Sequence, residues 1–149
     1  MLPKSNTTNQ NKSFIEQARR AQIIEATISV LAQNGYVNTS FAKIGKQAGI
    51  SASLISYHFK NKEELTEEVY KSILQGRAAH VGAKIAAAQT ASDKLRAAIE
   101  SDLFYMGTQP ELFQALVEIL FVARSKVDPA THRNDDIHAG FMPIADILK

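Results

Sequence analysis

The chain has 149 residues, of which 45% are hydrophobic and 21% charged, and it contains no cysteine. This composition allows a hydrophobic core in one domain, or in a small domain joined to a second, and it excludes disulfides and thiolate metal sites. The N-terminal segment MLPKSNTTNQNKS lacks the apolar stretch of a signal peptide, and no window of about 18 apolar residues predicts a membrane span, so we expect a cytoplasmic protein.

The net charge of +2 is distributed unevenly along the chain. Residues 1–62 carry eight lysines and arginines against two acidic residues, whereas residues 63–149 carry nine basic and thirteen acidic residues. This asymmetry indicates that the N-terminal part faces a polyanion and that the remainder does not.

Helical periodicity begins after a polar N-terminal segment. We expect residues 1–13 to form a disordered polar arm. A helix is predicted over 14–34, where apolar residues recur every three or four positions, and Gly35 can end it in the left-handed conformation. A second, short helix is predicted over 41–48, because the hydroxyl of Ser40 can cap its N-terminus.

Two further helices follow closely. The third covers about 52–58 and begins at a Ser51 cap. The fourth covers about 62–88, because Asn61 can cap it and Glu64, three residues later, is placed to complete a capping box.

The rest of the chain is also predicted to be helical. Helices are expected over about 93–107, from Pro110 through ELFQALVEILFVARS, and over 136–148 with a weaker pattern. No segment alternates with period two for long enough to predict a strand, so the sequence predicts an all-α fold.

The segment IGKQAGISASLISYHF predicts two helices joined by a tight turn, the helix-turn-helix unit. Ala48 is small where the helices approach, Gly49 permits the turn, and Ile50 fills the angle between them. Ile55 and Phe59, four residues apart, can bury one face of the second helix. The opposite face is then free to enter the major groove of DNA.

The residues predicted to contact DNA lie on this outer face and among the surrounding lysines, which can neutralise phosphates. They are Ser40, Lys43, Ser51, Ala52, Ser53, Tyr57, His58, Lys60 and Lys62. Other roles stay open for some of them. Ser40 and Ser51 are helix caps whether or not they touch DNA. Tyr57 or His58 could instead pack in the core, and any single lysine could simply be solvated.

The order A…NGY…TS…KIGKQAGIS…ISYHFKNKEEL resembles the N-terminal domain of TetR-family transcriptional regulators over about residues 14–70. The resemblance implies an all-helical homodimer whose C-terminal domain binds a small molecule and thereby lowers DNA affinity. The sequence departs from the commonest family pattern at Ser56, where a tyrosine is frequent, and at Ser53-Leu54. The Ile-Ser-Tyr-His-Phe variant is similar to the subgroup that includes betaine-pathway repressors. Family members usually run some tens of residues longer and dimerise through two further C-terminal helices.

We therefore expect a helix-turn-helix DNA-binding domain over 14–60, followed by a helical ligand-binding and dimerisation domain over 61–149. The expected function is that of a ligand-responsive repressor that binds a palindromic operator as a homodimer. No nucleophile elbow, phosphate loop or HExxH motif predicts an enzyme, and no cofactor or metal is expected. The alternatives are a helical protein-interaction module, whose basic end binds an acidic partner, and a small-molecule-binding protein without operator binding.

Large apolar side chains cluster in the two helices predicted after residue 93. They suit an ordinary helical core, but the cavity of a sensor is lined by the same residue types together with a few polar groups. The candidate ligand contacts are Phe104, Tyr105, Phe113, Glu118, Phe121 and Arg124. Farther on, HRNDDIH places His132 and Asp136 four residues apart, a spacing that suits a helical metal site, but the usual helical metal signatures do not occur.

Overall fold

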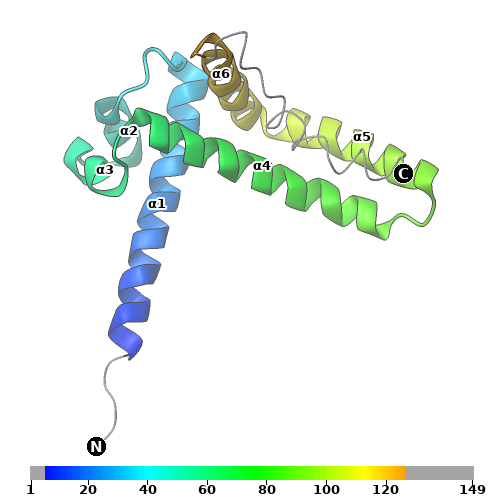
Figure 1. Cartoon of the computed structure of the whole chain (residues 1–149), viewed down its shortest axis with the longest axis horizontal. Coiled ribbons are helices and arrows are strands. Elements are labelled where there is room, and N and C mark those ends of the chain that lie inside the picture. The colour runs from blue at the N-terminus through cyan, green and yellow to red at the C-terminus, as the bar shows by residue number, and fades with distance from the viewer. Residues whose placement is uncertain (1–5, 127–149) are drawn as a thin grey trace, which may run out of the picture. The chain divides into compact units, whose positions relative to one another are not determined.

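A computed structural model describes the backbone of residues 6–126 and the side chains of residues 13–122. Within that range the chain forms helices joined by short connections, without a strand (Figure 1). The helices are α1 (Asn6–Asn34), α2 (Phe41–Ala48), α3 (Ala52–His58), α4 (Lys62–Ala87), α5 (Ala91–Thr108) and α6 (Pro110–Lys126). The predicted all-α fold is confirmed for this part of the chain. The helix expected over 136–148 and the HRNDDIH segment lie outside the described residues.

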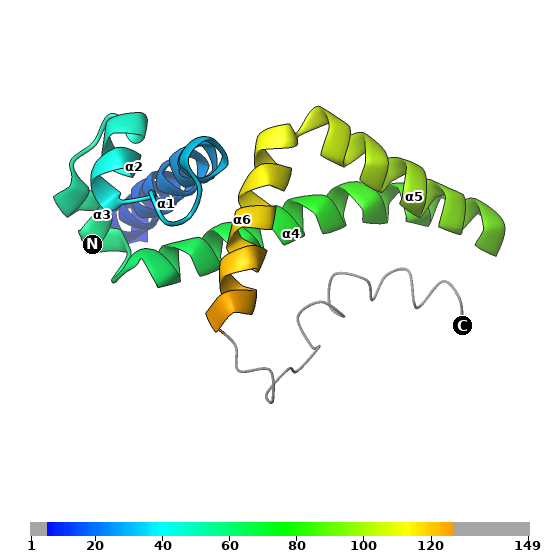
Figure 2. The ribbon, with the colours of Figure 1, turned by 90° about the horizontal axis from the view of Figure 1, so that it is seen from above.

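The chain divides into two compact units, Met1–Val69 and Tyr70–Lys149, and the division falls within α4. In the first unit, α2 packs beside α1 and α3 packs beside α2 (Figure 2). In the second unit, α5 packs against α6. Across the described residues, the chain offers no helix with both the length and the apolar character needed to cross a bilayer.

Fully buried apolar side chains hold the first unit together. They come from every helix of the unit and from the link after α3: Ile23, Leu31, Ile44, Ile55, Phe59 and Leu65 are each at most 1% exposed. Burying one such side chain contributes about 1.5–3 kcal/mol. This packing explains why α2 and α3 persist with only eight and seven residues, since helices of that length are marginal in isolation.

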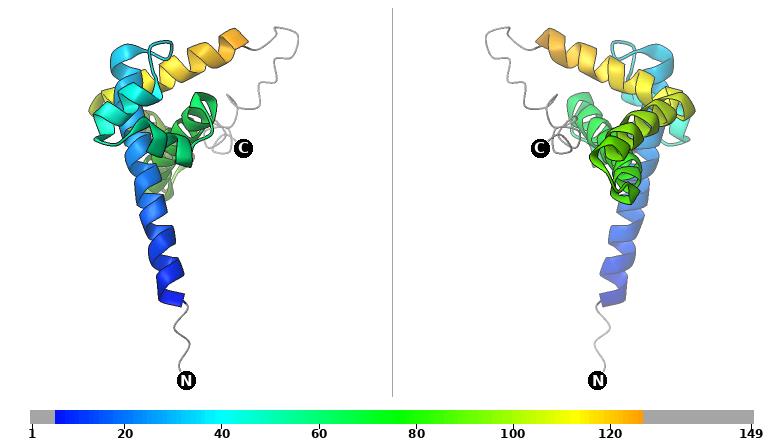
Figure 3. Two further views of the ribbon diagram at one scale, coloured as in Figure 1. Left: turned by 90° about the vertical axis from the view of Figure 1, so that its left-hand side faces the viewer. Right: turned by 90° about the vertical axis from the view of Figure 1, so that its right-hand side faces the viewer.

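The start of α1 differs from the prediction. The helix begins at Asn6, so most of the segment predicted to be a disordered arm is helical. Residues 6–13 include neither glycine nor proline, and extending a helix that has already formed requires far less free energy than nucleating one. The N-terminal turns of α1 therefore project past α2 and α3 (Figure 3).

Side-chain caps begin four of the helices. The hydroxyls of Ser40, Ser51 and Thr90 each accept a hydrogen bond from the backbone N–H three residues later, at 3.1–3.3 Å. At α4, Asn61 Oδ1 accepts the Glu64 N–H at 2.8 Å, as a capping box requires. The Glu64 carboxylate, however, accepts the N–H of Lys60, one residue before the cap, at 2.8 Å.

Gly45 lets the turn before α3 approach α2 closely. A Cβ atom on Gly45 would lie 2.6 Å from the carbonyl oxygen of Ile50 and 3.4 Å from the backbone nitrogen of Ala52. The turn itself is as predicted, because Gly49 adopts the left-handed conformation with φ 68°. The role predicted for Ala48 at this approach stays a prediction, and Gly45 is an additional contact that the sequence analysis did not name.

The second unit is held by fewer buried side chains. Val81, Ala98 and Ala115 are at most 5% exposed. A bidentate ion pair joins α4 to α5: Arg77 Nε and Nη2 donate to the two Asp102 carboxylate oxygens at 2.8 and 2.6 Å. Many large apolar side chains of α5 and α6 stay 37–75% exposed in this unit, namely Ile99, Leu103, Phe104, Met106, Phe113, Val117, Leu120 and Phe121.

Candidate nucleic-acid interface

The two faces of α3 differ as the sequence predicts. Ile55 is fully buried and Phe59, directly after the helix, is 1% exposed, so the inner face is anchored in the core. On the outer face, Tyr57 is 73% exposed and Ser53 is exposed as well. Ala52, in the first turn, is half-buried. A short helix therefore presents a convex, hydroxyl-bearing and aromatic surface to the solvent.

Two of the predicted DNA contacts are structural caps, and their hydroxyls are already engaged. Ser40 caps α2, and Ser51 caps α3. The Ser51 hydroxyl also lies 2.9 Å from the Ser53 hydroxyl, so the start of α3 carries a linked pair of exposed hydroxyls. These hydroxyls stabilise the N-terminal turn of α3, and in a helix-turn-helix this turn of the second helix contacts the base edges.

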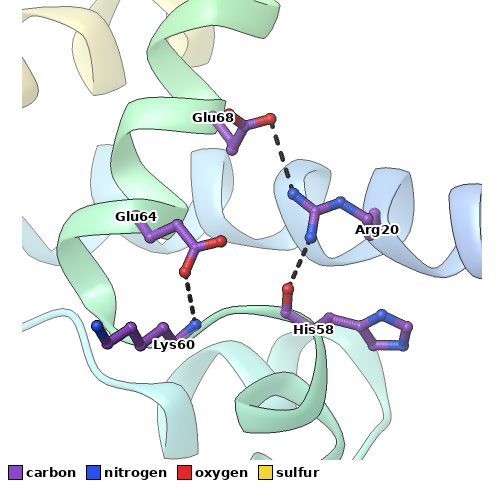
Figure 4. Close-up of polar contacts among 5 residues, drawn as sticks. All are labelled: Arg20, His58, Lys60, Glu64 and Glu68. Carbon is purple, nitrogen blue, oxygen red and sulfur yellow. Dashed lines mark hydrogen bonds and ion pairs between the residues drawn. The ribbon is translucent and has the colours of Figure 1, made fainter.

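Exposed lysines occur in α2 and in the link after α3. Lys43 and Lys46 lie on the outer side of α2, and Lys60 lies in the link between α3 and α4. Lys60 uses its backbone N–H for the bond to Glu64, while its side chain extends into the solvent (Figure 4). Three of the lysines in the helix-turn-helix region and its following link are thus exposed to the solvent.

Lys62 stands in a different environment from the other lysines. Its side chain is half-buried, and its ammonium group donates to the carbonyl oxygens of Tyr36 and Thr39 at 3.1 Å each. The same ammonium lies 4.2 Å from the centroid of the Tyr36 ring. These contacts hold the loop between α1 and α2 against the first turn of α4, so the charge of Lys62 is used within the protein.

His58 is half-buried, and its ring meets the Tyr57 ring edge-on at a centroid distance of 5.1 Å. Its carbonyl oxygen accepts a hydrogen bond of 2.6 Å from Arg20 Nη1 of α1. A second contact from α1 anchors the end of α2, where Gln22 Nε2 donates to the Ala48 carbonyl at 2.8 Å. Sequence reasoning counted Arg20 only as a charge, because a contact 38 residues away leaves no local pattern.

Comparison with known proteins agrees with this geometry. Residues 23–69, which include the helix-turn-helix, match the family model described as bacterial regulatory proteins, tetR family. Over 125 residues the chain is 30% identical to the fatty acid metabolism regulator protein of Bacillus subtilis, an alignment that covers 84% of this chain and 63% of that protein. Residues 23–69 thus match the TetR family, and the alignment with the Bacillus subtilis regulator extends the similarity over most of the chain.

A second relative and a solved structure are also similar to this chain. It is 33% identical over 92 residues to the HTH-type transcriptional regulator BetI of Paraburkholderia phymatum, covering 61% of this chain and 47% of the relative. The fold matches a crystal structure of a TetR family transcription regulator from Marinobacter aquaeolei with a TM-score of 0.75 at 20% identity, over 91% of this chain and 68% of that one. The chain thus spans between about half and two thirds of the length of these curated relatives.

The structure brings together only some of the residues predicted to bind a ligand. Phe104 and Tyr105 both contact His80 of α4, with ring centroids 6.1 and 5.5 Å from the His80 ring. Burial raises the pKa of the Tyr105 phenol, and the Arg77 charge opposes that shift.

The α6 residues do not join this cluster in an enclosed site. Phe113 is 41% and Phe121 is 75% exposed, and Phe104 itself is 61% exposed, so these rings line no closed cavity among the described residues. Glu118 is half-buried, and the side chain of Arg124 lies outside the described residues. A ligand contact for these residues therefore stays a prediction.

Proposed function

We propose that this protein is a DNA-binding transcriptional regulator, a ligand-responsive repressor that binds a palindromic operator as a homodimer in the cytoplasm. The proposal rests on the contrast between the two faces of α3. Ile55 on the inner face is fully buried, whereas Tyr57 and Ser53 on the outer face are exposed. An α-helix fits the major groove of B-DNA, and there its exposed side chains can bond base edges.

The surrounding charge supports binding to the phosphate backbone. Lys43, Lys46 and Lys60 are exposed in α2 and in the link after α3 and can each neutralise a phosphate. We leave Lys62 out of this set, because its ammonium is already bonded to two loop carbonyls. Phosphate contacts supply affinity and register, whereas Ser53 and Tyr57 supply the discrimination between sequences.

Binding as a dimer supplies the regulatory step. Two copies of α3 must lie one turn of DNA apart, about 34–36 Å, to engage both halves of a palindrome. A ligand that binds more tightly when this spacing is wrong shifts the population away from the DNA-binding state. The aromatic and aliphatic side chains of α5 and α6, together with the name of the Bacillus subtilis relative, favour an apolar effector such as a fatty acid.

Selection of bound duplexes from a random pool tests DNA recognition. The full chain should enrich a palindromic sequence, and log affinity for it should fall linearly with log salt at a slope of about 0.9 per phosphate contacted. Ser53→Ala should alter the enriched sequence, whereas Ser92→Ala, at an equally exposed serine of α5, should not. Equal affinity for every duplex, or tighter binding to an acidic protein than to DNA, would contradict the proposal.

The ligand response is tested on the enriched duplex. Titration with a long-chain fatty acid should release the DNA, and sedimentation should show that the released protein is dimeric. Operator affinity that stays constant up to saturating fatty acid would contradict an apolar effector. A monomer that binds only one half-site would contradict the proposed dimer.

A further inference from the structure

We propose that Arg20 is a positioning residue for the DNA-reading helix. It caps the C-terminal end of α3 and joins that end to α4 through Glu68, so it determines operator affinity without touching DNA. This inference rests on the proposed function, and it concerns a residue outside the set predicted to bind DNA.

The end of α3 needs an external partner. The last four carbonyl groups of any helix lack partners within the helix. In α3, the Ile55 carbonyl is satisfied by the Phe59 N–H at 2.9 Å. The His58 carbonyl, at the very end, accepts from Arg20 Nη1 at 2.6 Å. A guanidinium at this position also interacts favourably with the negative end of the helix dipole.

The Arg20 guanidinium makes three contacts at once. Besides the His58 carbonyl, its Nη2 lies 3.7 Å from Glu68 Oε2 of α4. Its central carbon lies 4.2 Å from the centroid of the Phe59 ring, which is itself buried in the core. A planar guanidinium can stack on a ring and donate in two directions in its own plane, which an ammonium cannot do.

Figure 4 shows how these contacts connect the helices. Glu64 and Glu68, one helical turn apart, lie on the same face of α4. Glu64 holds the Lys60 N–H directly, and Glu68 holds Arg20, which in turn holds His58. The end of α3 and Lys60, the second residue of the following link, are therefore both tied to one acidic face of α4. The direction in which α3 points depends on that face.

This role makes a prediction opposite to simple electrostatics. Glu68→Gln removes a negative charge from a protein that binds a polyanion, so charge alone predicts tighter DNA binding. Positioning predicts weaker binding, because Arg20 loses the partner that keeps it on the end of α3. Arg20→Lys conserves the charge and so should be harmless to a phosphate contact, but it cannot reproduce the three contacts of the guanidinium.

Operator affinity of the full chain tests the inference, with the enriched duplex as probe. Arg20→Lys should weaken binding by about tenfold, since a charged hydrogen bond such as that to the His58 carbonyl is a substantial contribution. Glu68→Gln should weaken binding by about threefold, because its ion pair with Arg20 is longer, at 3.7 Å, and partly exposed. Two matched controls should change affinity by less than about twofold: Arg96→Lys in α5, and Glu67→Gln, which neighbours Glu68 and makes the same charge change. The slope of log affinity against log salt should be unchanged, because no phosphate contact is lost.

Each alternative outcome is distinct. Tighter binding by Glu68→Gln, or full affinity in Arg20→Lys, would overturn the inference in favour of a charge effect. A lowered melting temperature with unchanged affinity in the fully folded variants would reduce Arg20 to a stability role and would also overturn it. If the wild-type chain enriches no sequence, the proposed function fails and this inference falls with it. If the wild type binds and both variants bind equally well, only the role of Arg20 fails.

Discussion

Replacing Gly45 with alanine tests how closely α2 and α3 are packed. The added Cβ would lie 2.6 Å from the Ile50 carbonyl oxygen, 3.4 Å from the Ala52 nitrogen and 3.5 Å from the Ser51 carbonyl carbon. All three neighbours are backbone atoms, so no side chain can rotate out of the way. The Ile50 N–H is also bonded to the Gly45 carbonyl at 2.9 Å, which ties the same turn from the other side.

The cost follows from this geometry. To reach an ordinary contact of 3.4 Å, the Ile50 carbonyl must move by about 0.8 Å. Overpacking of this kind costs about 1–3 kcal/mol. Alanine gains about 0.5–1 kcal/mol over glycine within a helix, which offsets part of that cost. We expect a net loss of about 1–2 kcal/mol in the free energy of unfolding of the first unit.

Thermal unfolding followed by far-ultraviolet circular dichroism measures the effect. Gly45→Ala should lower the melting temperature by roughly 2–8 °C, at about 2–4 °C per kcal/mol for a chain of this size. It should also weaken operator binding, because the turn that orients α3 opens. Gly82→Ala is the matched control: it lies within α4 with no atom within 4 Å of the new Cβ, so it should stabilise by about 0.5–1 kcal/mol. A Gly45→Ala variant as stable as the wild type would refute the packing argument.

Three further predictions follow from other contacts. Lys43→Gln should lower the salt slope of operator binding by about one and weaken all duplexes alike; an unchanged slope would remove Lys43 from the phosphate contacts. Arg77→Lys keeps the charge but loses the bidentate geometry with Asp102, so chemical denaturation should show a loss of about 1–2 kcal/mol, and an unaltered midpoint would show that the second unit does not depend on this pair. Because burial raises the pKa of the Tyr105 phenol above 10.0, although the Arg77 charge opposes the shift, the folded state holds this proton more tightly than the unfolded state. Stability should therefore fall as the pH rises above 10.0 and through the folded-state pKa, and Tyr105→Phe should reduce this alkaline loss; parallel pH profiles would contradict that assignment.

The parts of the fold that local chemistry determines were predictable from the sequence. The bounds of α2 and α3 agree with prediction, because Ser40 and Ser51 cap each start and Gly49 ends α2. The burial of Ile55 follows from its place in the helical pattern. The start of α1 was not predictable, because a polar segment without glycine or proline reads alike as coil or as an extension of a helix.

Contacts between distant segments account for the rest. From the sequence, Gly45 is only a weak helix former. Its importance comes from the Ile50 carbonyl, which would lie 2.6 Å from a Cβ atom at this position. Lys62 reads as one more surface lysine, because the carbonyls that it binds carry no sequence signal. In the second unit, Phe104 and Phe121 have the spacing of core residues, yet both are more than half exposed, since the same pattern describes any apolar helix face.

The connection between α3 and α4 contains only Phe59, Lys60 and Asn61. The Phe59 N–H donates to the Ile55 carbonyl at the end of α3. The Lys60 N–H donates to the Glu64 carboxylate of α4, and the Asn61 side chain caps the start of α4. Inserting or deleting a single residue would separate the bonded partners of at least one of these contacts, and the orientation of α3 against α4 would be lost. When this DNA-binding unit is fused to the sensor domain of another protein, the fusion point should therefore lie beyond the first turns of α4. The hybrid then keeps residues 59–61 and the contacts that orient α3.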